Sequence, residues 1–138
     1  MSALILKTSR TALAAAAVVL LGACGGSDSP TSPSGGGGGS AGPSGATITI
    51  GSNGAVSPAQ VTINVGQSVT FVNSDTRLHD MTSNPHPSHT DCPPMNAVGS
   101  LSPGQTKLTN AFTTARTCGF HDHANPGDAG LQGSITIR

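Results

Sequence analysis

The alternation of apolar and polar residues from Ala46 onward is the feature that most constrains the fold. Apolar side chains occupy every second position in residues 46–50 and 61–65, and the pattern resumes in residues 69–71. Successive side chains of a β-strand point to opposite faces, so this spacing predicts strands with one buried face. No segment combines the apolar spacing of a helix with capping residues. The chain therefore predicts an all-β domain.

The second half of the chain has three further segments of strand character, at residues 107–112, 117–121 and 133–137. About seven short strands over residues 46–138 predict a β-sandwich with Greek-key connections. The chain has three Phe and neither Trp nor Tyr, so its core has a modest hydrophobic reserve. A domain of this size would gain stability from a covalent crosslink.

Residues 1–24 have the features of a secretory signal. Lys7 and Arg10 precede an apolar, alanine-rich run at residues 11–21, which is too short to span a membrane comfortably. The run ends in Leu-Gly-Ala-Cys24 and resembles the bacterial lipobox, whose cysteine is lipidated and becomes the mature N-terminus. An ordinary cleaved signal that happens to end in Cys is the alternative. The resemblance implies an exported protein, lipid-anchored in the cell envelope, in the periplasm or at the outer membrane.

Residues 25–45 are rich in Gly, Ser and Pro and lack any periodicity, which predicts a flexible tether to the domain at residues 46–138. Six Lys and Arg balance six acidic residues. This balance excludes the basic field that nucleic-acid binding needs. The partner that we expect is the membrane, through a lipid anchor on Cys24, and we expect the domain to be a monomer.

Two cysteines remain after Cys24, namely Cys92 and Cys118. In an exported protein such a pair is most simply a disulfide. It would close a loop of about 26 residues and stabilise the fold by roughly 3 kcal/mol. The alternative is that one of the two is a metal-binding thiolate.

Residues 61–75, followed by His79, resemble the first half of a cupredoxin of the plastocyanin and azurin type. In that family a strand, a glycine turn and a second strand lead to the first copper-binding histidine, and His79 falls at this position. Residues 101–106 and 133–137 resemble the second half of the family. The resemblance covers almost the whole domain and implies a cupredoxin-like Greek-key β-sandwich that binds copper.

Two alignments of the copper-ligand region are open. In the first, Cys118 and His121 supply the thiolate and the second imidazole of a blue copper centre. In the second, Cys118 takes the place of a core aromatic residue, and Asp122 falls where the ligand cysteine is expected. The second is favoured because Cys118 and Phe120 then share the buried face, whereas the first would bury an arginine.

In the second alignment the metal ligands are nitrogen and oxygen atoms. His121 and His123 are two positions apart and point the same way on a strand. With His79 they could place three imidazoles around one ion, and Asp122 or a water could complete the shell. Such a site suits copper(II), and also zinc, and it would not be blue.

All five histidines of the chain lie between His79 and His123, and two of them, His86 and His89, belong to a proline-containing segment at residues 84–94. The prolines predict an irregular loop over the same end of the sandwich. Either loop histidine could swing in as a ligand. A solvent-facing position is the alternative for each.

These features predict an exported, lipid-anchored, copper-binding protein. It would act in electron transfer if a thiolate binds the metal, and in copper holding or delivery if none does. A redox protein, or a copper donor or acceptor, would be its partner. We expect an electron carrier or metal-binding protein rather than an enzyme.

Two alternatives remain. Residues 119–123, Gly-Phe-His-Asp-His, resemble the copper motif of copper/zinc superoxide dismutases, which leaves a copper enzyme open. The other alternative is a metal-free structural or adhesive lipoprotein domain. The clustering of the histidines argues against it.

Overall fold

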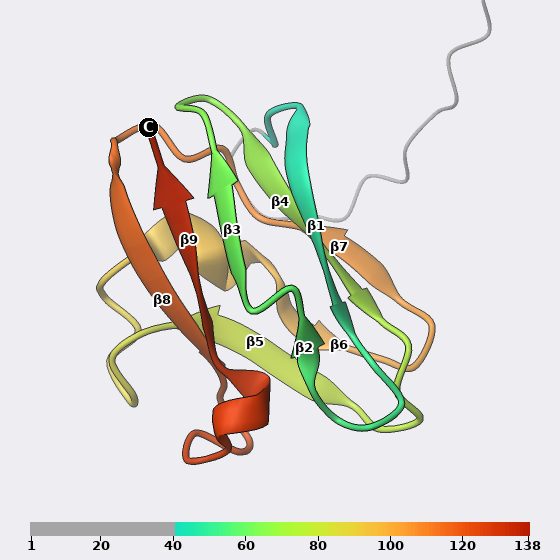
Figure 1. Ribbon diagram of the computed structural model, residues 1–138. Helices are drawn as coiled ribbons and strands as arrows, with labels where there is room; N and C mark the ends of the chain where they lie inside the picture. The colour runs from blue at the N-terminus through green and yellow to red at the C-terminus, as the bar shows by residue number, and fades with distance from the viewer. Residues whose placement is uncertain (1–40) are drawn as a thin grey trace, which may run out of the picture. The chain divides into compact units, whose positions relative to one another are not determined.

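The computed structural model describes residues 41–138 of the 138-residue chain (Figure 1). The predicted signal peptide with Cys24, and the predicted tether up to residue 40, lie outside the described residues. The first strand begins at Ser44, two positions before the predicted start of the domain. Within residues 41–138, no helix is long and apolar enough to cross a membrane.

Nine strands in residues 41–138 form two sheets (Figure 1). The first sheet has the order β2-β1-β4-β7 and consists of β1 (Ser44–Ile50), β2 (Val56–Ser57), β4 (Ser68–Asn73) and β7 (Thr106–Leu108). The second has the order β3-β9-β8-β5-β6 and consists of β3 (Gln60–Ile63), β5 (His79–Ser83), β6 (Gly99–Leu101), β8 (Arg116–Asp122) and β9 (Gly133–Ile137). The pairs β1–β4 and β3–β9 are parallel, and the other ladders are antiparallel.

The predicted all-β sandwich is confirmed. Over residues 41–138 the only helical segments are two short 3-10 turns, η1 (Pro93–Ala97) and η2 (Ala129–Leu131). Strands β2, β5 and β6 were not predicted, and the strand predicted at residues 107–112 ends at Leu108. The segment His79–Ser83 has one apolar residue, Met81, so it shows no apolar alternation, although His79 and Met81 both face the core.

Side chains of the two sheets meet in one apolar core. The rings of Phe71 on β4 and Phe120 on β8 pack edge to face, with centroids 5.3 Å apart. Cys118 is buried with Phe120 on the inner face of β8, as the strand parity predicted. Arg116, at the start of β8, is exposed.

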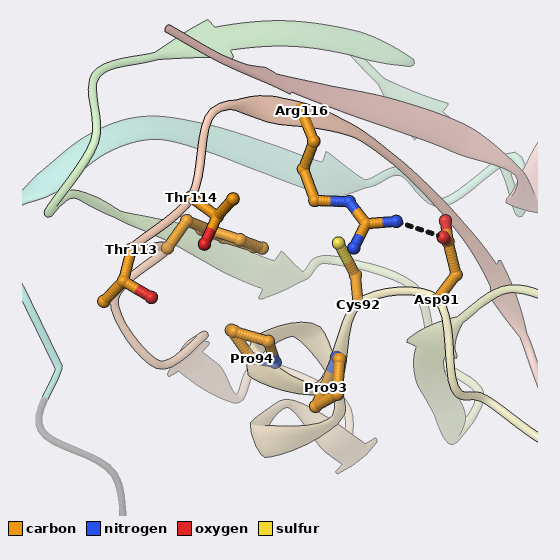
Figure 2. Close-up of a pocket in the computed structure, with 8 residues that line it drawn as sticks. Asp91, Cys92, Pro93, Pro94, Thr113, Thr114 and Arg116 are labelled. Atoms are coloured by element: carbon orange, nitrogen blue, oxygen red, sulfur yellow. Dashed lines mark hydrogen bonds and ion pairs between the residues drawn. The ribbon is translucent and has the colours of Figure 1, made fainter.

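A disulfide joins Cys92 to Cys118, with the two Cα atoms 5.8 Å apart. Figure 2 shows a shallow pocket beside it, where the Arg116 guanidinium pairs with the Asp91 carboxylate. The disulfide and the ion pair both connect the segment before η1 to β8. They therefore hold the loop at residues 84–91 against this strand, which brings two loop histidines to the site described next.

Candidate metal centre

The pairing of β5 with β8 determines which side chains face the core. Met81 pairs with Asp122, and Thr82 pairs with His121. Directly opposed residues in an antiparallel ladder lie on the same face of the sheet. Because Met81 belongs to the core, Asp122 also faces inward, whereas Thr82, His121 and His123 share the outer face.

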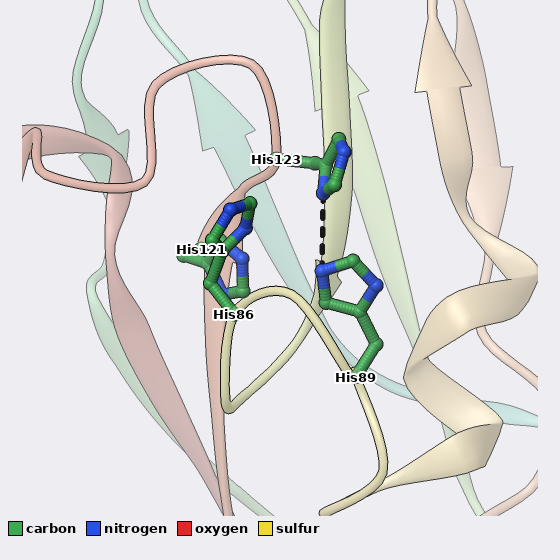
Figure 3. A group of neighbouring side chains, drawn as sticks. All are labelled: His86, His89, His121 and His123. Atoms are coloured by element: carbon green, nitrogen blue, oxygen red, sulfur yellow. Dashed lines mark hydrogen bonds between the residues drawn. The ribbon is translucent and has the colours of Figure 1, made fainter.

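Four histidines converge on this outer face (Figure 3). His86 and His89 come from the loop after β5, and His121 and His123 come from the end of β8. One nitrogen of each ring belongs to a set of four atoms that all lie within 4.8 Å of one another. Nδ1 of His123 and Nε2 of His89 are 3.1 Å apart. Imidazole nitrogens that bind one ion at 2.0–2.1 Å are separated by about 3 Å, so the cluster is close to coordination geometry.

His121 presents a free ring nitrogen to the cluster. Its Nδ1 lies 2.7 Å from the side-chain oxygen of Asn84. An amide oxygen only accepts hydrogen bonds, so Nδ1 carries the hydrogen and Nε2 keeps its lone pair. Nε2 is buried and has no hydrogen-bond partner in residues 41–138. Since buried polar atoms are almost always paired, an ion bound here would satisfy this nitrogen.

The electrostatics of the cluster favour uncharged imidazoles. Burial lowers the pKa of His89 and of His121 below the ordinary value of histidine, and neighbouring imidazoles lower both further. A histidine must lose its ring proton at the ligating nitrogen before it binds a metal. The lowered pKa values of His89 and His121 therefore favour the uncharged rings that a metal ion requires.

His79 lies elsewhere, and the structure does not bring it together with His121 and His123. Its side chain is 1% exposed on the inner face of β5. Nδ1 is 2.8 Å from Oδ2 of Asp122, and Nε2 is 3.0 Å from Oδ2 of Asp75. Two carboxylate acceptors are satisfied only when both ring nitrogens donate, so neither nitrogen offers a lone pair to a metal. The reason for the separation is strand parity, which places His79 and the pair of β8 histidines on opposite faces.

Asp122 also serves the inner face rather than the histidine cluster. Burial alone would raise its pKa, but the hydrogen bonds that it accepts from His79 and from the N–H groups of Asp80 and Ala124 lower this pKa on balance. The hydrogen bond from His79 is also the main reason why the pKa of Asp75 falls to about 2. Asp75, His79 and Asp122 thus form a buried ionic cluster.

The remaining predicted site residues fall into two groups. The sulfur of Cys118 is bonded to Cys92, so no free thiolate is present for the blue copper alignment. His86 and His89, which the sequence offered only as additional ligands, are half of the histidine cluster. Inner-face positions for Cys118 and Phe120 already imply outer-face positions for His121 and His123, and this signal was available in the sequence.

Comparisons with known proteins agree with the fold. No protein-family model and no curated protein matches the chain in sequence. Among solved structures, it is similar to a purple cupredoxin from Nitrosopumilus maritimus, with 20% identity, 67% of this chain and 99% of the other covered, and a TM-score of 0.52. It is also similar to plastocyanin from Dryopteris crassirhizoma, with 18% identity, 67% and 99% covered, and a TM-score of 0.52. For auracyanin from Roseiflexus castenholzii the values are 21% identity, 70% and 99% covered, and a TM-score of 0.52.

These similarities define the class of fold. The chain contains a cupredoxin-like β-sandwich, as its sequence resemblance predicted. The four-histidine cluster, by contrast, is a property of its own side chains. Its donor set of four imidazoles, one with a buried nitrogen that has no partner among residues 41–138, fits a transition-metal ion.

Proposed function

We propose that this domain binds copper at the cluster of His86, His89, His121 and His123, and that it holds or delivers the ion. The observation that carries the proposal is the convergence of four imidazole nitrogens within 4.8 Å. Four imidazoles this close together repel one another when they are protonated. A bound metal ion keeps the four rings unprotonated and accepts one nitrogen lone pair from each.

The donor set selects among metals. Imidazole suits copper and zinc, and divalent copper binds a given nitrogen site more tightly than zinc does. Four nitrogen donors without sulfur give a copper(II) centre that lacks the thiolate of blue copper proteins. Because Cys118 is in a disulfide, copper holding or delivery is favoured over electron transfer.

The exposure of the ligands supports transfer of the ion to a partner. His86 and His123 are exposed and His89 is half-buried, whereas His121 is buried. A partner protein could therefore replace the outer ligands one at a time while His121 still holds the ion. Asn84 fixes the ring of His121 through Nδ1, so this buried ligand keeps its orientation during the exchange.

The proposed setting is the cell envelope. The signal and lipobox at residues 1–24 would export the chain and attach a lipid to Cys24, and residues 25–45 would hold the domain away from the membrane surface. A copper donor or acceptor in the same compartment would be its partner. Radiolabelled palmitate incorporation that is lost in Cys24→Ala would test the anchor.

The test of copper binding is a titration of the purified protein with Cu(II), followed by visible and electron paramagnetic resonance spectroscopy. We expect one equivalent to bind, with a weak visible band and nitrogen hyperfine structure. An intense blue band would instead place a thiolate on the metal. Loss of all copper on dialysis would refute the proposal and favour a metal-free structural domain.

A further inference from the structure

Asp80 is the acidic residue that shares the outer face of the sheet with the β8 histidines. It lies two positions before Thr82 on β5, and its backbone oxygen accepts a 2.7 Å hydrogen bond from the N–H of His123. Asp80 and His123 are therefore neighbours across the ladder, with side chains on the same face. The side chain of Asp80 is half-buried.

A polar hollow connects Asp80 to two of the four histidines. Its lining includes Asp80, Thr82, His89, Asn96 and His123. Asn96 fixes the floor, because its side-chain oxygen accepts a hydrogen bond from Thr82 and its amide donates to the backbone oxygen of His89. Asp80, His89 and His123 thus line the same hollow.

The carboxylate of Asp80 makes no hydrogen bond to another group in the part of the chain that the structure describes. Only its backbone bonds are engaged, since its N–H donates to Asp122 and its oxygen accepts from His123. It takes part in none of the ion pairs found among residues 41–138.

We propose that Asp80 is the outer carboxylate of the histidine cluster and that its charge makes the cluster prefer Cu(II) to Cu(I). The inference rests on the copper site proposed above. The carboxylate of Asp80 is not among the four ligand atoms that lie within 4.8 Å of one another, so it acts on the site through its electric field rather than as a ligand. Four neutral imidazoles leave the full charge of the ion uncompensated, and a nearby carboxylate stabilises the divalent ion more than the monovalent one.

The test replaces Asp80 by Asn, which removes the charge and keeps the shape. Affinities for Cu(II) and Cu(I) are measured separately against competing chelators. We expect the Cu(II) affinity to fall by about tenfold, the scale typical of outer-shell partners, with a much smaller change for Cu(I). A tenfold change in the ratio raises the one-electron reduction potential by about 59 mV.

Two further variants make the experiment decisive. Asp80→Glu restores the charge and should restore the ratio of the two affinities. Asp128→Asn removes the same charge at an exposed position outside the hollow, and asparagine can still cap the turn at Gly130, so this ratio should not change. If the parent protein binds no copper, the proposed function fails. If it binds copper and Asp80→Asn leaves the ratio unchanged, only the role of Asp80 is refuted.

Discussion

Substitution of His79 by alanine distinguishes the ligand set that the sequence resemblance predicted from the set that the structure assembles. In the folded protein this ring lies between Oδ2 of Asp75 at 3.0 Å and Oδ2 of Asp122 at 2.8 Å. His79→Ala leaves the two carboxylates without their shared donor on the inner face of the sheet. The four-histidine cluster on the outer face keeps all of its nitrogens.

The expected effect is a large loss of stability with little loss of copper affinity. Removing one partner of a buried ionic pair costs about 3–5 kcal/mol. For a domain of about 100 residues, each 1 kcal/mol shifts the thermal midpoint by roughly 4–8 °C, so we expect His79→Ala to melt at least about 12 °C lower. In the protein that remains folded, the Cu(II) affinity should change by less than about threefold, because outer-face geometry does not depend on the lost ring.

His121→Ala is the matched variant and should give the opposite result. A four-ligand structural site has an apparent binding free energy of roughly 10–16 kcal/mol, or about 3 kcal/mol per ligand. Since each 1.4 kcal/mol is a factor of ten, loss of His121 should weaken Cu(II) binding by about a hundredfold. The thermal midpoint of the metal-free protein should fall less than that of His79→Ala, because the substitution removes one hydrogen bond, to Asn84, together with a buried nitrogen that lacks a partner.

The assay must suit a chain without Trp or Tyr. Unfolding is followed by far-UV circular dichroism or calorimetry, and copper affinity by competition with a chelator well below the midpoint of the weaker variant. The reasoning is refuted if His79→Ala retains the parental midpoint and loses copper. That outcome would restore His79 as a ligand.

Three further predictions concern protons and the disulfide. Copper affinity should fall as the pH drops through the lowered pKa values of His89 and His121. The metal-free protein should gain stability as the pH rises towards 7, because at these two histidines the unfolded chain binds protons with the ordinary pKa of 6.5, whereas the folded chain binds them only at lower pH. Titrations of affinity and of midpoint against pH measure both. The pKa of Asp75 is about 2 in the folded protein and 3.8 in the unfolded chain, so its stabilising contribution is complete above pH 3.8 and is lost as the pH falls through 2. In Asp75→Asn, the stability should therefore depend less steeply on pH between about 4 and 2. Replacing Cys92 and Cys118 by serine should cost about 3 kcal/mol in chemical denaturation and also weaken copper binding, because the loop is then less firmly tied to β8.

The fold was predictable because most strands carry a period-two apolar pattern that survives in any tertiary context. β1, β4 and β9 show it directly, and their inward positions are apolar except for Asn73 at the end of β4. β5 does not, because its inward positions include His79, whose polarity is compensated by Asp75, four positions earlier in the chain, and by Asp122, 43 positions later. A local pattern cannot report compensation between residues 79 and 122.

The site was predictable in part. The parity of β8 follows from Cys118 and Phe120, and it places His121 and His123 together on the other face. The contribution of His86 does not follow from any pattern, because it depends on the path of an irregular loop. That path is determined by long-range contacts, namely the disulfide at Cys92 and the hydrogen bonds of Asn96, which hold it over the strand.

The register of β8 determines both faces of the sheet at once. A shift of one residue would turn His121 into the core and bring Asp122 to the surface, because side chains alternate strictly along a strand. The register is held by the burial of Phe120 against Phe71 and by the disulfide at Cys118. Neither Phe120 nor Cys118 belongs to the histidine cluster. Residues that form the core and the disulfide therefore decide where the imidazoles gather. On the inner face, Asp122 meets His79 where the cupredoxin resemblance places a ligand cysteine. The histidine cluster lies on the outer face, and this is where we propose that the ion binds.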